Sequence, residues 1–415
     1  MTDAQRIVIV GASLAGASAA ETLRSEGYPG QVVLIGAESE LPYERPPLSK
    51  GVLLGKDQPE SAQLHDQQWY DDRSIELRLG TTVIALDTAA KTVTTDDGRT
   101  TGYDELLIAT GSRVRRLDVP GGDLAGVHYL RTAGDSQALT AAYAAKPRVV
   151  VVGAGWIGLE SAAAAKERGC EVTVIEPQPT ALASVLGEQV GALFAELHRQ
   201  HGVRLRFGTG VEGFEGSDRV TGVRTSAGEV VPADLVVVGV GVQPNTELAE
   251  AAGIEVATRE NGAGIVTGPD LRTNVAGVYA AGDVARWQHP LLGRPVRVEH
   301  WSNAKQSGAV AAKAMLGQDV AHDALPFFFT DQYDVGMEYA GDVPRGTAYQ
   351  VVLRGDPASG AYLAFWLDEA RHVLAGMHVN TWGAIDGIQE LIRSGRPVDP
   401  ARLTDPTVGL ADVQG

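Results

Sequence analysis

The sequence predicts an α/β fold made of two similar strand–turn–helix–strand units, followed by a small α+β domain. The two units occupy residues 6–38 and 147–177, and each places a glycine-rich turn between an apolar strand and an alanine-rich helix. Strands that alternate with helices form parallel sheets, and this order is typical of Rossmann-like dinucleotide-binding domains. Residues 321–415 differ, because strand-like runs precede one amphipathic helix there. We therefore expect two Rossmann-like domains and a small α+β C-terminal domain.

Length, charge and apolar runs narrow the class of protein. At 415 residues the chain is long enough for about three domains. A net charge of −17 argues against a nucleic-acid partner, because phosphate backbones bind basic faces. The longest apolar runs, such as 235–242, fall short of the roughly 20 residues that span a bilayer, so we expect no membrane partner. The N-terminus enters a strand without a signal peptide, and the single cysteine fits a reducing compartment, which predicts a cytoplasmic protein.

The first unit carries a dinucleotide-binding turn with serine at its middle position. Glycines let the chain turn tightly and approach a pyrophosphate, and the helix that follows offers free N–H groups. An acidic residue after the second strand accepts hydrogen bonds from ribose hydroxyls. The serine weakens the motif, whereas the correct order of strand, turn, helix, strand and acid strengthens it. The candidate binding residues are Gly11, Ser13, Ala15, Gly16 and Glu38.

The second unit matches the dinucleotide-binding pattern more fully. Five residues of strand lead into a turn with all three glycines, and a glutamate closes the next strand. The alternative is a glycine-rich turn of an unrelated α/β domain, which two such units in one chain disfavour. The candidate binding residues are Gly153, Gly155, Ile157, Gly158 and Glu176.

Glu176 also favours NADH over NADPH. A carboxylate beside the 2′-phosphate of NADPH meets a like charge, at about 4 kcal/mol per charge pair for a separation of ~4 Å and an effective dielectric near 20. That corresponds to roughly three orders of magnitude in affinity. Residues 177–182 contain no arginine or lysine that would reverse this preference.

Two further segments connect the first unit to a flavin. Residues 105–112 form a strand that ends in Thr110 and Gly111, and residues 273–286 form a short apolar strand that ends in Gly282 and Asp283. With the two glycine turns, these segments in this order resemble the two-dinucleotide-binding flavoproteins, which include glutathione reductase. The resemblance implies FAD at the first turn, a nicotinamide nucleotide at the second, and Asp283 on the ribityl chain.

The resemblance also implies a domain organisation. Residues 1–113 and 245–320 are expected to form a discontinuous FAD-binding domain, and residues 114–244 an inserted NAD-binding domain. Residues 321–415 are expected to form the C-terminal domain.

The segment LPYERPPLSKG, residues 41–51, contains no cysteine. Disulfide reductases of this family carry a redox cysteine pair at this place in the chain. The single cysteine, Cys170, lies at a helix-to-strand junction of the second unit, where a buried and inert thiol is expected. Electron transfer through a cysteine is therefore excluded.

Four motifs, YERPPLSKG, WIGLE, EHWSNA and FFFTDQYD, together resemble the NADH-dependent ferredoxin reductases that serve oxygenases. The resemblance covers essentially the whole chain. It implies an enzyme that passes electrons from NADH through FAD to a [2Fe–2S] ferredoxin serving a cytochrome P-450 or a Rieske oxygenase. No cysteine is needed, because a flavin converts two-electron into one-electron transfer.

The resemblance assigns residue roles by position. Lys50 is expected near the flavin N5 edge, paired with Glu160 as the two catalytic residues. The alternative for Lys50 is a solvated lysine. The alternative for Glu160 is a first-turn glutamate that interacts favourably with the helix dipole. The remaining expected contacts are Arg45 and Trp301 to FAD and Gly241 to the nicotinamide.

Two local features bear on electron transfer. Phe329 stands where family members often carry tryptophan, so a path through an indole is in doubt. Between residues 285 and 313 a set of basic residues accompanies a single acid, Glu299, and predicts a docking patch for an acidic ferredoxin; a solvated face is the alternative. The set is Arg286, Arg294, Arg297, Lys305 and Lys313.

Three other functions remain open from the sequence. A rubredoxin reductase and a flavin NADH oxidase fit the same motif order. An NADH-sensing binding protein of the apoptosis-inducing-factor type shares the fold, but the basic targeting stretches expected for it are absent from the sequence. We expect a monomer with no metal site.

Overall fold

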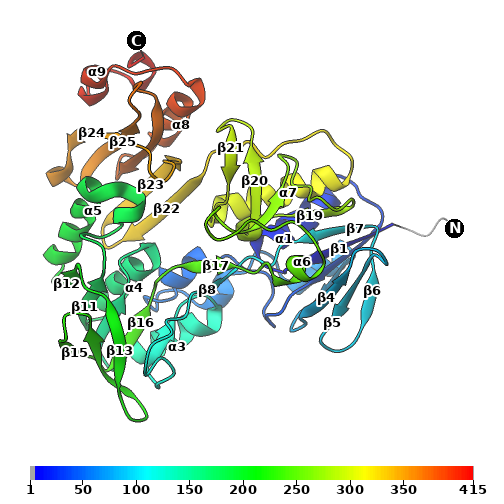
Figure 1. Cartoon of the computed structure of the whole chain (residues 1–415), viewed down its shortest axis with the longest axis horizontal. Coiled ribbons are helices and arrows are strands. Elements are labelled where there is room, and N and C mark those ends of the chain that lie inside the picture. The colour runs from blue at the N-terminus through cyan, green and yellow to red at the C-terminus, as the bar shows by residue number, and fades with distance from the viewer. Residues whose placement is uncertain (1–4, 415) are drawn as a thin grey trace. The chain divides into compact units, whose positions relative to one another are not determined.

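The computed structural model describes residues 5–414 (Figure 1). Contacts divide the chain into two compact units. The first comprises residues up to Glu44, Glu60–Arg113 and Gln243–Pro326. The second comprises Arg45–Pro59, Val114–Val242 and the residues from Phe327 onward. The predicted division into three domains stays a prediction.

A five-stranded parallel sheet forms the centre of the first unit, in the order β19-β7-β1-β2-β3. Valine, isoleucine and leucine fill these strands because both faces of the sheet are buried. The strands are β1 (Arg6–Val10), β2 (Gln31–Ile35), β3 (Ile75–Arg78), β7 (Glu105–Ile108) and β19 (Val278–Ala280).

Helices α1 (Leu14–Ser25) and α7 (Trp301–Met315) pack against each other. They bury the face of this sheet that carries Ile7 and Ile9. The opposite face, with Val8 and Val10, packs against a small antiparallel sheet. The small sheets of the unit are β4 (Val83–Asp87), β5 (Thr92–Thr95) and β6 (Thr100–Gly102), and β18 (Ile265–Thr267), β20 (Ala285–His289) and β21 (Arg294–Val296). The remaining helices are α2 (Gln67–Asp72), α6 (Glu247–Ala251), η2 (Pro59–Ala62) and η3 (Gly282–Val284).

The second unit contains the other predicted Rossmann-like sheet, in the order β12-β11-β10-β16-β9 with all pairs parallel. Its strands are β9 (Val127–Tyr129), β10 (Arg148–Val152), β11 (Glu171–Glu176), β12 (Arg204–Phe207) and β16 (Leu235–Val238). The accompanying elements are η1 (Pro46–Ser49), α3 (Ala133–Tyr143), α4 (Trp156–Glu167), α5 (Ala183–Gln200), β13 (Val211–Gly216), β14 (Val220–Thr225) and β15 (Val230–Pro232). The chain crosses between the units in β8 (Ser112–Val114) and β17 (Val242–Pro244).

The C-terminal segment of the second unit is an antiparallel sheet with helices beside it (Figure 1). The sheet, in the order β22-β23-β26-β25-β24, shares one hydrophobic core with the parallel sheet of this unit. The Nε1 atom of buried Trp366 donates to the carbonyl of Leu186 in α5 at 3.2 Å. The elements are β22 (Phe327–Gln332), β23 (Val335–Gly341), β24 (Gln350–Asp356), η4 (Pro357–Ser359), β25 (Ala361–Leu367), β26 (Val373–Val379), α8 (Ile385–Ser394), α9 (Pro400–Thr404) and η5 (Leu410–Asp412). The predicted fold class is confirmed.

Candidate active site

The first glycine turn is held so closely that only glycine fits at two of its positions. Gly11 has a φ of +118°, and a Cβ there would lie 2.1 Å from the Ala109 carbonyl oxygen. A Cβ on Gly16 would lie 1.9 Å from the Gly11 oxygen. The twelve-residue helix α1 begins after Ser13, whose side chain makes no capping hydrogen bond within residues 5–414. The first N–H groups of α1 can therefore receive a phosphate, which fits the dinucleotide expected here.

The other candidates of the first unit follow the carboxyl ends of strands β2 and β19 of the same parallel sheet. Glu38 comes after β2 and accepts a short hydrogen bond from the Tyr43 hydroxyl. A Cβ added at Gly282, after β19, would lie 3.0 Å from the Ala15 Cβ, and Asp283 is the next residue. In an open parallel sheet ligands bind along this edge. Tyr43 is a residue that the sequence motif did not identify.

Thr110 and Gly111 stand at the end of β7, beside the first turn. The Thr110 hydroxyl donates to the Asn245 carbonyl at 2.8 Å, and the Asn245 amide returns a bond to the Thr110 carbonyl at 2.8 Å. The Thr110 side chain therefore fixes the returning chain at residue 245. Gly111, with a φ of +64°, makes the turn.

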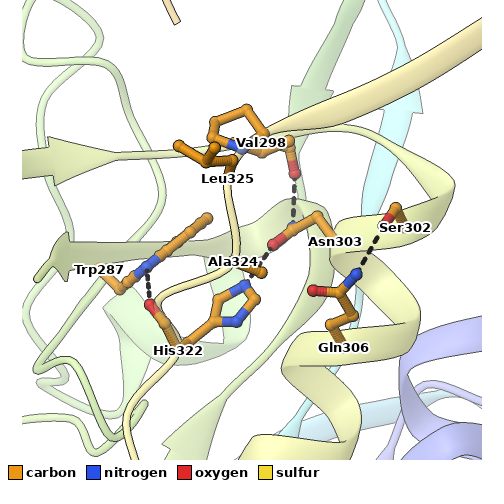
Figure 2. Close-up of a pocket in the computed structure, with 9 residues that line it drawn as sticks. Trp287, Val298, Ser302, Asn303, Gln306, His322, Ala324 and Leu325 are labelled. Carbon is orange, nitrogen blue, oxygen red and sulfur yellow. Dashed lines mark hydrogen bonds between the residues drawn. The ribbon is translucent and has the colours of Figure 1, made fainter. Parts of the chain in front are cut away.

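Trp301 begins α7, and a small buried polar cluster holds the chain beside that helix end (Figure 2). The Asn303 amide donates to the Val298 carbonyl at 2.8 Å, and its oxygen lies 2.9 Å from His322 Nε2. Trp287 Nε1 donates to the His322 carbonyl at 3.0 Å. The enclosed cavity of about 10 Å³ has room for roughly one water and not for a dinucleotide. This cluster positions α7.

The second glycine turn has the same tight geometry with one open position. A Cβ on Gly153 would lie 2.4 Å from the Gly239 oxygen, and a Cβ on Gly158 would lie 2.1 Å from the Gly153 oxygen. At Gly155, by contrast, no described atom lies within 4 Å of an added Cβ. Ile157, in the first turn of α4, is 41% exposed. The open side of Gly155 is where a pyrophosphate can approach the backbone.

Glu176 lies at the end of β11 with its carboxylate turned to this glycine turn. It accepts hydrogen bonds from the backbone N–H of Ala154 at 2.7 Å and of Gln178 at 2.9 Å. These bonds hold it beside the turn, where an adenine ribose lies in Rossmann-like domains. Gly241, with a φ of +95°, follows β16 and has no described atom within 4 Å of an added Cβ.

Lys50 and Glu160 form a buried ion pair within the second unit. The Lys50 ammonium lies 2.8 Å from Glu160 Oε1, and the side chains are 17% and 4% exposed. Glu160 also accepts hydrogen bonds from the hydroxyls of Ser49 and, at 2.6 Å, Thr330. A charge this deeply buried needs such donors, because water does not reach it. The pairing predicted from the motifs is thus present, and the solvated-lysine alternative is wrong.

The sequence motifs did not identify Ser49 and Thr330 as hydrogen-bond donors to this ion pair. Both stand next to motif residues that were named, since Ser49 precedes Lys50 and Thr330 follows Phe329. The Lys50 ammonium lies 5.3 Å from the centroid of the Phe329 ring. Asp331 completes the surroundings, and burial raises the pKa of this carboxyl, with Lys50 opposing and Glu160 adding to the rise.

Arg45 lies in the second unit, whereas the candidate residues of the first glycine turn lie in the first unit. Its Nη1 donates to the Arg131 carbonyl at 2.5 Å.

Cys170 is 2% exposed, and burial raises the pKa of its thiol. The prediction of a buried thiol is confirmed.

Two residues of the predicted basic patch are engaged within the first unit. Arg297 pairs with Glu299 and donates to the Asp283 carbonyl at 3.1 Å, and Lys313 lies 3.5 Å from Glu26. Of the five basic residues Lys305 is the one whose residue as a whole is exposed; the other four are partly buried. The docking patch stays a prediction, with Lys305 as its most accessible charge.

Residues 5–414 contain no group of three or more side chains suited to a metal ion and no helix long and apolar enough to cross a membrane.

Two family models match the chain. The first, described as pyridine nucleotide-disulphide oxidoreductase, matches residues 5–308, and the second, described as reductase C-terminal, matches residues 327–414. These matches confirm the predicted oxidoreductase class and its FAD and nicotinamide cofactors.

Relatives are similar over nearly the whole length. The chain is 43% identical over 410 residues to the anthranilate 1,2-dioxygenase system ferredoxin–NAD(+) reductase component of Burkholderia cepacia, with 98% of each protein covered. It is 40% identical to rhodocoxin reductase of Rhodococcus erythropolis, covering 97% of this chain and 93% of that one.

Solved structures agree with this similarity. The ferredoxin reductase for the CYP199A2 system from Rhodopseudomonas palustris matches with a TM-score of 0.93 at 35% identity, covering 99% of this chain and 100% of that one. The covalent putidaredoxin reductase–putidaredoxin complex matches with a TM-score of 0.93 at 36% identity, covering 99% of this chain and 98% of that one.

Proposed function

The chain belongs to the pyridine nucleotide-disulphide oxidoreductase family, and from that premise we propose that it is an FAD-dependent NADH:ferredoxin oxidoreductase. It passes electrons from NADH to a [2Fe–2S] ferredoxin that serves a cytochrome P-450 or a Rieske oxygenase. End-to-end similarity to reductase components of oxygenase systems supports this reading.

The observation that carries the proposal is a buried Lys50–Glu160 pair in a chain whose only cysteine is buried elsewhere. When bound, FAD would supply the two-electron to one-electron conversion that links NADH to a ferredoxin. Lys50 supplies a positive charge for an electron-rich ring, and Glu160 keeps that charge in place. No thiol is required for either task.

We propose that FAD is held by residues at the carboxyl edge of the first parallel sheet, together with Arg45. The N–H groups at the start of α1 bind its diphosphate, Glu38 accepts from a ribose, and Asp283 accepts from the ribityl chain. The full set is Gly11, Ser13, Ala15, Gly16, Glu38, Arg45, Lys50, Thr110, Gly111, Asp283 and Trp301.

We propose that NADH binds at the second glycine turn. The open side of Gly155 receives the pyrophosphate, Glu176 accepts from the ribose hydroxyls, and Gly241 allows the nicotinamide to approach. The full set is Gly153, Gly155, Ile157, Gly158, Glu176 and Gly241.

The same proposal extends to organisation and location. Residues 1–113 and 245–320 make up the FAD-binding domain, 114–244 the NAD-binding domain and 321–415 the C-terminal domain. The protein acts as a cytoplasmic monomer. Size-exclusion chromatography with light scattering tests the monomer, and a dimer mass contradicts it.

Reduction of cytochrome c tests the function, with NADH or NADPH and with or without a bacterial [2Fe–2S] ferredoxin. Strong stimulation by ferredoxin with NADH is the expected result. Fast NADH consumption that ignores ferredoxin and yields peroxide favours the flavin oxidase instead.

A further inference from the structure

A buried chain of hydrogen bonds leads away from Glu160 through the second unit. Thr330 contacts Glu160 Oε1 at 2.6 Å, and Gln332 Nε2 lies 3.1 Å from the Thr330 hydroxyl. Gln332 Oε1 lies 2.8 Å from His198 Nε2, and His198 Nδ1 lies 3.2 Å from the Tyr333 hydroxyl. Thr330, Gln332 and His198 are each at most 1% exposed. The chain connects β22 with α5.

The carboxylate at one end fixes the direction of every bond in this chain. An ionised carboxylate can only accept, so Thr330 must donate its single proton to Glu160. Thr330 must then accept from the Gln332 amide nitrogen, which turns the Gln332 oxygen to His198. That oxygen requires a proton on His198 Nε2, which leaves Nδ1 to accept from Tyr333 in a neutral ring.

The surroundings of His198 favour the neutral ring. Burial lowers its pKa to about 4; the Gln332 hydrogen bond opposes this, and His201 adds to it. Tyr333 stacks on the His201 ring with centroids 3.6 Å apart, which holds its hydroxyl at His198. In all four hydrogen bonds of the chain, the donor therefore lies on the side away from Glu160.

We infer that Gln332 and His198 are positioning residues, which lock the Thr330 hydroxyl as a donor and so keep Glu160 charged and directed at Lys50. This inference rests on the proposed role of the Lys50–Glu160 pair in flavin reduction. Without the lock, the Thr330 proton is free to turn to another acceptor, and the carboxylate is protonated more readily. The other ionisable groups that face these residues are Asp331 beside Glu160, Glu338 beside Asp331, and His201 and Glu167 beside Tyr333.

Nitrogen NMR of the FAD-loaded protein, labelled in its histidine rings, tests the direction of the chain without measuring activity. The His198 signal is assigned by its loss in His198→Gln. The expected result is a neutral ring protonated at Nε2 from pH 6 to 8. A ring protonated at Nδ1, or a charged ring at pH 7, overturns the inference.

Stopped-flow reduction of the flavin by NADH, recorded against pH, tests the consequence for Glu160. Gln332→Met keeps the volume and removes both hydrogen bonds, so the acid limb of the profile is expected to move up by about one pH unit. In Gln332→Glu the new carboxylate can only accept from Thr330, so it competes with Glu160 for the Thr330 proton. Flavin reduction is expected to be slower than in Gln332→Met. His198→Gln retains a donor and is expected to leave the acid limb where it lies in the unsubstituted protein. His372→Gln, at a partly exposed histidine bonded to Asp368, is the matched control.

The variants also separate this inference from the proposed function. If Glu160→Gln leaves flavin reduction unchanged, the role of the Lys50–Glu160 pair and the positioning role both fail, whereas the ferredoxin reductase function is decided separately by the cytochrome c assay. If Glu160→Gln slows reduction while the Gln332→Met profile superimposes on the original, only the positioning role fails. Should Gln332→Met not fold, Thr330→Ser and the isosteric Thr330→Val make the same comparison, because only serine keeps the donor.

Discussion

Glu160 illustrates how single residues set the chemistry of this protein. It is 4% exposed, and a lysine and two hydroxyls surround its carboxyl group. A buried ion pair adds little to stability by itself, whereas removal of one partner leaves an uncompensated charge. Such a pair is therefore better explained by function than by folding, which agrees with the proposed place of Lys50 beside the flavin.

Glu160→Gln is expected to slow flavin reduction by NADH roughly 100-fold, because the Lys50 charge loses its partner and its orientation. Stopped-flow absorbance at saturating NADH measures the rate. Glu167→Gln, an exposed glutamate on the same helix, is the control and is expected to retain the original rate. Equal rates in the two variants contradict the role of the pair.

Glu176 governs the choice of nucleotide at the same scale. Glu176→Gln removes the like charge from the 2′-phosphate, so kcat/KM for NADPH relative to NADH is expected to rise roughly 100-fold or more. Glu171→Gln, an exposed residue at the start of the same strand, is expected to leave the ratio unchanged. An unaltered ratio in Glu176→Gln shows that another residue sets the preference.

At the scale of elements, the two glycine turns fix where α1 and α4 begin. Each turn brings the start of a helix so close to the backbone of the turn itself that a single methyl group does not fit, as the 2.1 Å approach of a Cβ on Gly158 to the Gly153 oxygen demonstrates. Gly155 in the same turn has room for one. Substitutions at Gly158 and Gly155 therefore test folding and nucleotide binding separately.

Gly158→Ala is expected to destabilise the protein by roughly 1–3 kcal/mol through overpacking, measured by urea unfolding. Gly155→Ala is expected to keep the free energy of unfolding and to weaken NADH binding, because its methyl group occupies the approach of the pyrophosphate. Titration of the flavin-loaded protein with NAD(H) measures that loss. Equal stability of the two variants contradicts the tight approach of α4 to β10.

An ion pair joins the amino ends of the neighbouring strands β10 and β16 in the parallel sheet of the second unit. Asp234 accepts from the Arg148 side chain at 2.6 Å and from its backbone N–H at 2.9 Å, and the side-chain hydrogen bond lowers the pKa of Asp234 to about 2. A lowered carboxyl pKa contributes stability above the unfolded value near 3.9 and loses it as the pH falls toward 2.

Asp234→Asn is therefore expected to reduce the free energy of unfolding at pH 7 by about 1 kcal/mol or less, since both side chains are about half exposed and solvent screens the pair. The difference from the unsubstituted protein is expected to shrink between pH 4 and pH 2. Denaturant unfolding at a series of pH values measures it. A difference that stays constant over that range contradicts the electrostatic origin.

At the scale of the whole molecule, the sequence predicted what local patterns encode. Both parallel sheets, both glycine turns and the amphipathic helix around Ile388 were predictable, because apolar periodicity and glycine spacing act over short distances. The contact of Thr330 with Glu160 was not, since 170 residues separate them and no motif links a strand hydroxyl to a distant carboxylate. The shared core of the C-terminal sheet and the second parallel sheet was hidden for the same reason.

We propose that this chain delivers electrons from NADH to a ferredoxin without a cysteine. The most direct measurement is steady-state reduction of cytochrome c by the FAD-loaded protein through a bacterial [2Fe–2S] ferredoxin, with Cys170→Ala beside the unsubstituted chain. Ferredoxin is expected to stimulate the NADH-dependent rate strongly, NADPH is expected to support little of it, and Cys170→Ala is expected to be as active as the unsubstituted chain. A rate that does not respond to ferredoxin, or that is lost in Cys170→Ala, contradicts cysteine-free electron delivery to a ferredoxin.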